Sequence, residues 1–131
     1  MAEESYPEDL RYHPEHDWAR IDGEEATFGI TWYAQDALGE VVFFDPPEVG
    51  VQVTRDQPYA EVESVKAVSD VFAPLSGEIV DVNAALADQP EKINQDPYGE
   101  GWMVKVRLSE PSEAEELLDV AAYRDLLQSG A

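Results

Sequence analysis

The chain has 131 residues and carries 29 acidic against 8 basic side chains, which gives a net charge of −21 at pH 7. This charge excludes a nucleic-acid interface and binding to anionic membranes, because both need a cationic face. The absence of cysteine excludes disulfides, thiolate metal ligands and thiol nucleophiles, and no apolar run is long enough to span a bilayer. We expect partners with basic patches, a surface adapted to a salty cytoplasm, or both.

The N-terminal part of the chain is predicted to form a β-hairpin. Met1 to Ser5 is acidic and has neither an apolar signal core nor an Arg-rich presequence, so we expect a cytoplasmic protein. Residues 1–9 are polar and contain proline, which predicts a loose lead-in. Asp22-Gly23 is a turn signal between an apolar pattern that starts at Trp18 and residues 24–30.

A short helix is predicted directly after this hairpin. Thr31 has the side chain of an N-cap residue, residues 32–38 form the helix, and Gly39 suits the left-handed backbone with which helices often end. Residues 40–44 return to the composition of a strand, which stops at Asp45-Pro46-Pro47.

From Val49 onward the pattern is one of short strands separated by turns. Residues 59–64 alternate between small or apolar and acidic side chains, as a half-buried strand does. Many short strands with few helices indicate a small barrel or sandwich, and the whole chain, residues 1–131, is predicted to be one mainly-β domain. Further strands are predicted over residues 49–53, 67–72 and 78–83.

The last third of the chain is predicted to contain one more strand and a helical end. Residues 88–101 read as a long, turn-rich loop, and residues 102–108 as a final strand with Trp102 on its apolar face. Ser112 is expected to cap a C-terminal helical segment over residues 112–128, because acidic side chains follow it in the first turn.

The sequence contains no recognisable catalytic constellation. His13 and His16 are the only imidazoles, and neither a nucleophile elbow nor a phosphate-cradling glycine loop accompanies them. Two histidines three residues apart in a loop are more often ordinary polar residues than metal ligands. We therefore predict neither an enzyme nor a metal site.

Lys66 is the distinctive residue of the chain. It is one of three lysines, and it lies at the turn of a predicted hairpin between Glu61 and Glu63 on one strand and Asp70 on the next. An ordinary surface lysine would be neutralised there by these carboxylates. A lysine displayed for covalent modification would suit the same place, and the hairpin alone leaves both interpretations open.

The sequence around this lysine, Glu63-Ser64-Val65-Lys66-Ala67-Val68-Ser69-Asp70, resembles the lipoyl-attachment motif of the glycine cleavage system H-protein family. The resemblance extends from Tyr12 to Leu127 and implies the barrel-sandwich hybrid fold of lipoyl and biotinyl carriers, with a short internal helix and C-terminal helices. Other segments resemble the family in order and spacing: His16-Asp17-Trp18, Phe28-Gly29-Ile30-Thr31, Ala34 to Gly39, Ala73 to Gly77, Val82-Asn83 and Asn94 to Trp102.

The resemblance implies a carrier and not an enzyme. Lipoate would be joined as an amide to Lys66 and would take up the aminomethyl group of glycine at the pyridoxal-phosphate-dependent glycine decarboxylase. The other implied partners are the tetrahydrofolate-dependent aminomethyltransferase, the FAD-containing dihydrolipoamide dehydrogenase and a lipoate-attaching enzyme. The chain itself is expected to be a monomer.

The resemblance also implies roles for three carboxylates. Asp17 and Asp70 match positions of a cleft into which the family's loaded arm folds back, and carboxylates suit a cationic aminomethyl group. Glu63 and Asp70 are candidates for recognition by the lipoate-attaching enzyme. Asp17 stands where the family usually has the longer Glu, and Trp32 replaces an acidic residue after the Thr cap.

Related carriers are the alternatives. A lipoyl domain of a 2-oxoacid dehydrogenase complex would have Asp-Lys-Ala at the tip and a flexible linker, whereas this chain has Val65-Lys66-Ala67 and a helical end. A biotin carrier would have Met-Lys-Met. An H-like protein that relays lipoyl groups to other carriers, and an unmodified binding module, are compatible with the same residues.

Overall fold

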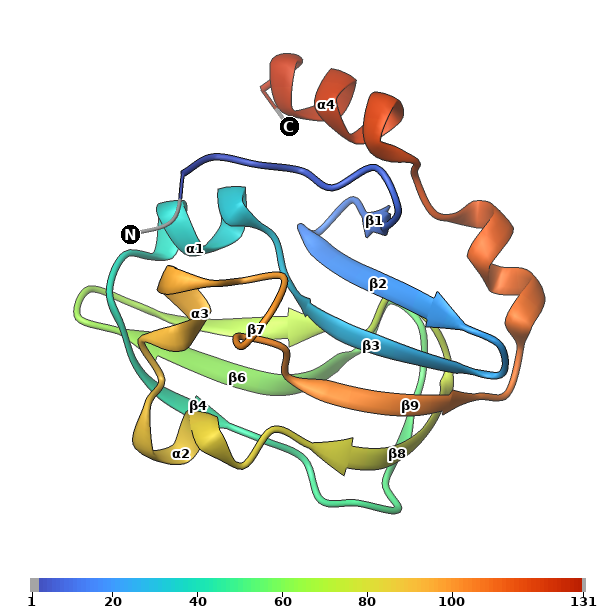
Figure 1. Ribbon diagram of the computed structural model, residues 1–131, viewed down its shortest axis with the longest axis horizontal. Coiled ribbons are helices and arrows are strands. Elements are labelled where there is room, and N and C mark those ends of the chain that lie inside the picture. The colour runs from blue at the N-terminus through green and yellow to red at the C-terminus, as the bar shows by residue number, and fades with distance from the viewer. Residues whose placement is uncertain (1–2, 131) are drawn as a thin grey trace.

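The computed structural model describes residues 3–130 and consists of two antiparallel sheets with short helices (Figure 1). The six-stranded sheet has the order β1-β2-β3-β9-β8-β5, and the three-stranded sheet has the order β4-β6-β7. The strands are β1 (Arg11–His13), β2 (Asp17–Asp22), β3 (Glu25–Ile30), β4 (Val41–Asp45), β5 (Gln52–Val53), β6 (Pro58–Ser64), β7 (Val68–Phe72), β8 (Gly77–Val82) and β9 (Val104–Leu108). The helices are α1 (Trp32–Leu38), α2 (Ala85–Asp88), α3 (Lys92–Gln95), the 3₁₀ helix η1 (Pro111–Glu116) and α4 (Val120–Gln128). The predicted mainly-β sandwich is confirmed.

The predicted N-terminal hairpin and first helix are both present. β2 and β3 form a regular antiparallel ladder that turns at Asp22-Gly23. The Thr31 Oγ1 accepts a hydrogen bond from the backbone N–H of Ala34 at 3.2 Å, which caps α1. Gly39 ends the helix with a φ of 85°. These features depend on residues close in sequence, so the local pattern is enough to predict them.

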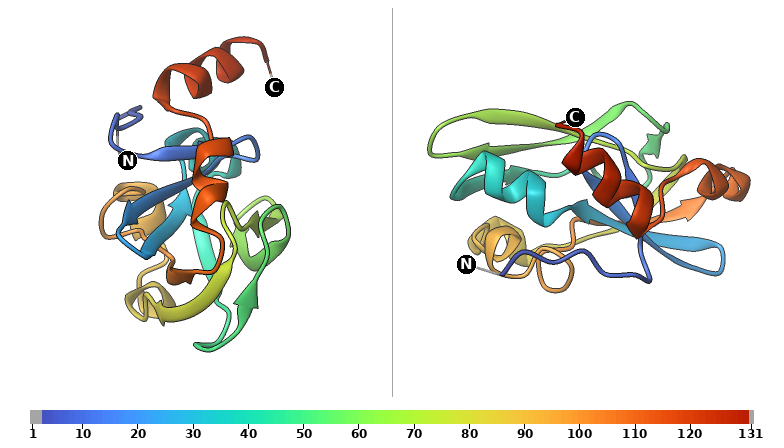
Figure 2. Two further views of the ribbon diagram at one scale, coloured as in Figure 1. Left: turned by 90° about the vertical axis from the view of Figure 1, so that its right-hand side faces the viewer. Right: turned by 90° about the horizontal axis from the view of Figure 1, so that it is seen from above.

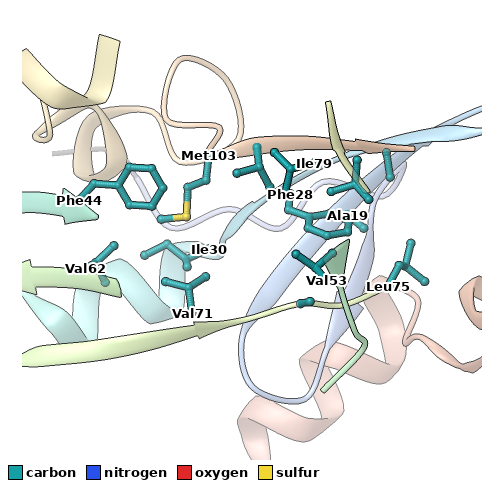
Figure 3. Close-up of a cluster of buried hydrophobic side chains, with 14 of the residues drawn as sticks. Ala19, Phe28, Ile30, Phe44, Val53, Val62, Val71, Leu75, Ile79 and Met103 are labelled. Atoms are coloured by element: carbon teal, nitrogen blue, oxygen red, sulfur yellow. The ribbon is translucent and has the colours of Figure 1, made fainter. Parts of the chain in front are cut away.

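The hydrophobic core lies between the two sheets. Side chains of a strand alternate between its faces, and in β9 this alternation buries Val104, Val106 and Leu108 while Lys105 and Arg107 face solvent. No helix within residues 3–130 is long and apolar enough to cross a bilayer. Figure 3 shows core side chains converging from both sheets, among them Phe28, Ile30, Phe44, Val62, Val71, Ile79 and Met103.

A second, aromatic cluster joins both ends of the chain to the six-stranded sheet. Tyr123 of α4 stacks on Tyr12 of β1 with ring centroids 4.6 Å apart and planes 6° from parallel. Tyr6 meets Tyr123 edge-on at 5.5 Å. Residues 3–9 contain no helix or strand, yet Tyr6 is buried in this cluster. In Figures 1 and 2, α4 accordingly lies beside the N-terminal lead-in at one end of the molecule.

Two predictions for the last third of the chain are wrong. The segment expected to be a loop, residues 88–101, contains the helix α3 and directly follows the helix α2. Each of these helices is a single turn that buries one apolar side chain completely: Leu86 in α2 and Ile93 in α3. The final strand begins at residue 104, and Trp102 packs against the aromatic cluster instead of the core.

The C-terminal segment also begins differently from the prediction. Ser112 caps nothing, because it lies inside η1, which has no side-chain cap. The Glu113 carboxylate instead accepts hydrogen bonds from the backbone N–H and the hydroxyl of Ser76, at 2.7 and 3.0 Å. The α-helix starts later, where Asp119 accepts from the N–H of Ala122 at 2.9 Å.

Candidate functional site

The hairpin of β6 and β7 carries Lys66 at its tip, which reaches the left-hand edge of the molecule in Figure 1. Ser64 is buried and organises the turn: its Oγ accepts hydrogen bonds from the backbone N–H of Lys66 at 3.2 Å and of Ala67 at 3.1 Å. Its own N–H donates to the carbonyl of Ala67 at 2.8 Å. Serine side chains stabilise tight turns by such bonds, so the backbone that presents Lys66 is well fixed.

The loop after α1 fixes the same turn from the outside. The backbone N–H of Val65 donates to the carbonyl of Glu40 at 3.0 Å. On either side of Glu40, the carbonyl of Gly39 accepts from Asn94 Nδ2 at 2.9 Å and the N–H of Val41 donates to Asn94 Oδ1 at 2.8 Å. Asn94 is buried. Hydrogen bonds in such a site are strong, and leaving one unmade is costly.

Among the residues that the structure describes, the ammonium group of Lys66 has no ion-pair partner. Within residues 3–130, no carboxylate lies within the 4.0 Å of an ion pair from Lys66 Nζ. Lys92, by contrast, pairs with Glu100 at 2.9 Å, and Lys105 lies over the Trp102 ring at 5.2 Å. Lys66 is exposed. The interpretation of Lys66 as a salt-bridged surface lysine therefore has no support in the geometry.

A cleft of about 380 Å³ opens beside the hairpin, between β7, α1 and the turn that joins β1 to β2. This volume falls in the range of small-molecule sites, about 300–1,000 Å³. Of the described residues, no lysine or arginine lines the cleft. The walls suit an elongated apolar group with a cationic end. Its apolar lining includes Ile30, Ala34, Leu38, Val62 and Val71, and its charged or polar lining includes Glu15, His16, Asp17 and Asp70.

Asp17 is the unusual group in this cleft. Its side chain is buried, with 1% of the residue exposed, and its Oδ2 has no hydrogen-bond partner among residues 3–130. Burial, and secondarily the charge of Glu15, raises the pKa of the Asp17 carboxyl well above its usual value of 3.8, while a hydrogen bond from the backbone of Phe72 opposes this. A cationic donor that enters the cleft would satisfy the oxygen and favour the carboxylate.

His16 and Tyr33 form another part of the cleft wall. Their rings lie 4.5 Å apart, and the His16 backbone has a φ of 72° in the left-handed region. Burial lowers the pKa of the His16 imidazole, although the charge of Glu15 opposes this. The imidazole is therefore neutral at pH 7. Any negative charge that the cleft presents to a ligand comes from its carboxyl groups.

The structure separates the three carboxylates that the sequence singled out. Asp17 and Asp70 both line the cleft. Glu63 is exposed and lies in register between Phe43 of β4 and Val68 of β7, on the three-stranded sheet. Glu63 is thus close to Lys66 along the chain but outside the cleft.

The two histidines have unrelated environments. His13 Nε2 is 2.6 Å from Asp56 Oδ1, and His13 Nδ1 accepts from the N–H of Glu15 at 3.0 Å, so Nε2 carries the proton of the neutral ring. His16 instead faces the cleft. Over residues 3–130, no group of three His, Asp or Glu side chains is arranged to hold a metal ion.

Comparison with known proteins decides the family. The family model described as Glycine cleavage H-protein matches residues 10–130. The chain belongs to this family. Proteins named Glycine cleavage system H protein are similar over nearly their whole length: that of Symbiobacterium thermophilum is 52% identical over 124 residues, which cover 95% of this chain and 97% of the relative. That of Halorhodospira halophila is 51% identical over 122 residues, covering 92% and 94%.

The fold agrees with a solved member of the H-protein family. The crystal structure of a glycine cleavage system H protein from Mycobacterium marinum matches with a TM-score of 0.85 at 41% sequence identity, over 96% of this chain and 100% of that one. As an H-protein, the chain is a non-catalytic, lipoyl-bearing carrier that works with the enzymes of the glycine cleavage system. The family resemblance inferred from the sequence is confirmed.

Sequence reasoning missed the residues that support the site in this H-protein. For Ser64 a signal exists, because a serine directly before a tight turn often bonds to the turn's backbone. For Asn94 and Tyr123 the partners lie far away in the sequence, at residues 35–41 and at residues 16 and 31. No local pattern indicates such contacts.

Proposed function

We propose that Lys66 is the attachment residue for lipoate, joined as an amide through Nζ, and that the cleft receives the loaded arm. The observation that carries this proposal is the lysine itself, exposed on a fixed turn and without a carboxylate partner among the described residues. Acylation removes the positive charge of an amine. Because Lys66 makes no ion pair with any residue from 3 to 130, that loss would break no ion pair of the described chain.

The residues present fit such a group. When bound, lipoate would supply a redox-active cyclic disulfide that could take up an aminomethyl group from the glycine decarboxylase. The aminomethyltransferase would receive that group, and dihydrolipoamide dehydrogenase would oxidise the remaining dithiol back to the disulfide. The chain's part is to retain and release the arm. The apolar wall from α1 and β7 excludes water, and Asp17 and Asp70 attract the cationic end.

Asp17 is suited to this role by its unpaired oxygen. Burial raises the pKa of this carboxyl and so favours its protonated form over the carboxylate. A cation beside Oδ2 stabilises the carboxylate, so its arrival displaces that proton and gives a charge-assisted hydrogen bond. Asp17 has a shorter side chain than the Glu that the family usually has at this position. It lies in the cleft wall, paired with Ile30 in the β2–β3 ladder. The arm therefore has to enter the cleft deeply to reach it.

Recognition by the lipoate-attaching enzyme is assigned to the tip and the exposed face around it. Glu63 is exposed and flanked in register by Phe43 and Val68, which are 52% and 58% exposed. A carboxylate between two exposed apolar side chains offers both charge and apolar contact area to an enzyme that must approach Lys66.

Attachment is tested by mass spectrometry of the full chain after incubation with a lipoate ligase, ATP and lipoate. We expect one lipoyl group, located by peptide mapping on Lys66. Lys66→Arg should abolish the modification, whereas the matched variants Lys92→Arg and Lys105→Arg should be modified fully. Modification of the Lys66→Arg protein, or none of the parent chain, would contradict the assignment.

Transfer is tested by glycine–bicarbonate exchange with the decarboxylase. The lipoylated parent chain should stimulate exchange and the Lys66→Arg chain should not. A lipoylated chain that stimulates no exchange but donates lipoyl groups to other carriers would be a lipoate relay instead. Monomeric state and cytoplasmic location stay predictions, for which size-exclusion chromatography and cell fractionation are the tests.

A further inference from the structure

The hydroxyl of Tyr123, on the C-terminal helix, lies between two walls of the cleft. It is 2.8 Å from His16 Nδ1 and 2.8 Å from Thr31 Oγ1. His16 belongs to the turn between β1 and β2, and Thr31 is the N-cap of α1. One hydroxyl therefore adds a link between two elements that are also joined by the backbone bond from the Thr31 N–H to the His16 carbonyl, at 3.0 Å, and by the contact between the His16 and Tyr33 rings.

Both linked residues lie at the start of segments that line the cleft. His16 lines it and is followed by Asp17. Thr31 starts the helix whose Tyr33, Ala34, Ala37 and Leu38 line it. No residue of α4 is part of the lining, so the direct route from Tyr123 to the cleft runs through the two residues that it bonds.

The position of the Tyr123 hydroxyl is set by the aromatic cluster. The residue is completely buried, its ring is stacked on Tyr12, and Tyr6 packs against it in a T-shaped, edge-on contact at a centroid distance of 5.5 Å. Rings packed in this way have little rotational freedom. The hydroxyl is therefore a fixed point to which the cleft walls are attached.

The hydrogen bonds can be completed in either tautomer of a neutral His16. In one arrangement the Thr31 hydroxyl donates to Tyr123, and Tyr123 donates to His16 Nδ1. In the other, Nδ1–H donates to Tyr123, and Tyr123 donates to Thr31. Thr31 Oγ1 retains its bond from the N–H of Ala34 in both. The link thus persists when the ring changes tautomer.

We propose that Tyr123 is a positioning residue for the arm-binding cleft: by tying His16 to Thr31 it fixes the relative placement of the Asp17 segment and α1, and so prolongs the retention of the loaded arm. This inference rests on the proposed function of the cleft. It makes the C-terminal helix part of the retention machinery, although that helix never touches the arm.

The test compares Tyr123→Phe with Tyr12→Phe in the full-length, lipoylated chain. Both variants remove one buried hydroxyl from the same aromatic stack, but that of Tyr12 donates to the Pro7 carbonyl at 2.6 Å and does not touch the cleft walls. After loading by the decarboxylase with glycine, the loaded arm should decay roughly 3- to 10-fold faster in Tyr123→Phe, the fold-change that loss of a buried hydrogen bond produces. Tyr12→Phe should decay at the parental rate.

A second readout uses the chain without lipoate. In Tyr123→Phe, the ¹⁵N chemical shifts of the His16 imidazole should change, because Nδ1 loses its partner, whereas they should stay the same in Tyr12→Phe. If Tyr123→Phe does not fold, Thr31→Val and its matched control Thr31→Ser replace it, since only serine preserves the hydroxyl. Equal decay rates in the Tyr123→Phe and Tyr12→Phe proteins, or in the two Thr31 variants, would overturn the inference.

Failure of the proposed function gives a different result. In that case the loaded parent chain would decay as fast as loaded free lipoamide, which has no cleft. If the parent protects the arm and Tyr123→Phe protects it equally, the cleft functions as proposed but Tyr123 does not position it.

Discussion

The side chain of Lys66 lies against the backbone of Gly39: a methyl group on the Gly39 Cα would be 3.4 Å from Lys66 Cε and 3.8 Å from Cδ. Gly39 has a φ of 85° and a ψ of −161°, a region of the backbone map that only glycine adopts readily. The residue that ends α1 therefore also provides the surface over which the lysine stem passes.

Replacing Gly39 by Ala should both destabilise the chain and disturb the lysine. Forcing a side chain into this backbone region costs about 1–3 kcal/mol, and the added methyl narrows the space beside Cε. We expect a lower urea midpoint and several-fold slower lipoylation. Gly23→Ala is the control, because its φ is 65° but nothing lies within 4 Å of the added methyl. If both variants were lipoylated equally fast, the contact would be irrelevant to presentation of Lys66.

Asn94→Ala should separate the lysine turn from its support. The change removes bonds to Gly39, Val41 and the Gln35 side chain at 2.8–2.9 Å. Unpaired buried groups of this kind should lower the free energy of unfolding by about 2–4 kcal/mol, as measured by urea denaturation. Lipoylation should slow as well, since the Val65–Glu40 bond depends on the same loop.

The control for this variant is Asn83→Ala. Asn83 is also buried and donates to the carbonyls of Glu100 and Trp102, both at 2.8 Å, far from the lysine turn along the chain. It should be destabilised without a change in lipoylation rate at temperatures where it is folded. Equal lipoylation rates in the Asn94→Ala and Asn83→Ala proteins would show that the loop is not needed for presentation.

The elements that the sequence predicts well are those whose determinants are local. The Asp22-Gly23 turn and the Thr31 cap are each decided within a few residues. α2 and α3 are single turns without side-chain caps, and a single turn has little stability of its own. They form because Leu86 and Ile93 are buried by distant segments, which no local periodicity reveals.

The same distinction applies to the C-terminal segment and to the site. Ser112 has the sequence of a capping box, but the carboxylate of Glu113 finds a distant partner in Ser76 and the first turns form a 3₁₀ helix. Lys66 could be identified because its motif is contiguous. The unpaired Oδ2 of Asp17 could not, because its isolation follows from tertiary burial.

Asp17 should make the stability of the chain fall as pH rises. Burial, then the charge of Glu15, raises its pKa in the folded state above 3.8. Between this value and the raised one, the folded chain retains a proton that the unfolded chain has released, so the free energy of unfolding decreases with increasing pH. Asp17→Asn removes this dependence. Its stability relative to the parent should therefore increase from about pH 4 upward, as measured by urea denaturation at a series of pH values.

The matched control for the pH experiment is Asp36→Asn, an exposed carboxyl on α1. Its pH profile measures the effect of removing a carboxyl that is not buried. A profile for Asp17→Asn parallel to that of the parent would mean that Asp17 is ionised in the folded chain without cost, and the physical basis for cation capture in the cleft would be lost.

The exposed face of the three-stranded sheet carries a row of carboxylates, which should make partner binding depend on salt concentration. Glu61 lies in register between Asp45 of β4 and Asp70 of β7, so three carboxylates form one cross-strand row. Like charges directly opposite each other are destabilising in a sheet. Glu61→Gln should therefore raise the urea midpoint slightly, while slowing association with a partner that presents a basic patch.

Stopped-flow association of the lipoylated chain with the glycine decarboxylase measures this effect. The rate should fall roughly tenfold or more between about 0.1 and 1 M salt, because the screening length shortens from about 10 to 3 Å. Glu61→Gln should reduce the steepness of that dependence, and Glu115→Gln, on η1 away from the row, should reduce it less. A rate that is independent of salt would instead assign the net charge of −21 to adaptation of the surface to a salty cytoplasm, since such a surface need not steer any partner.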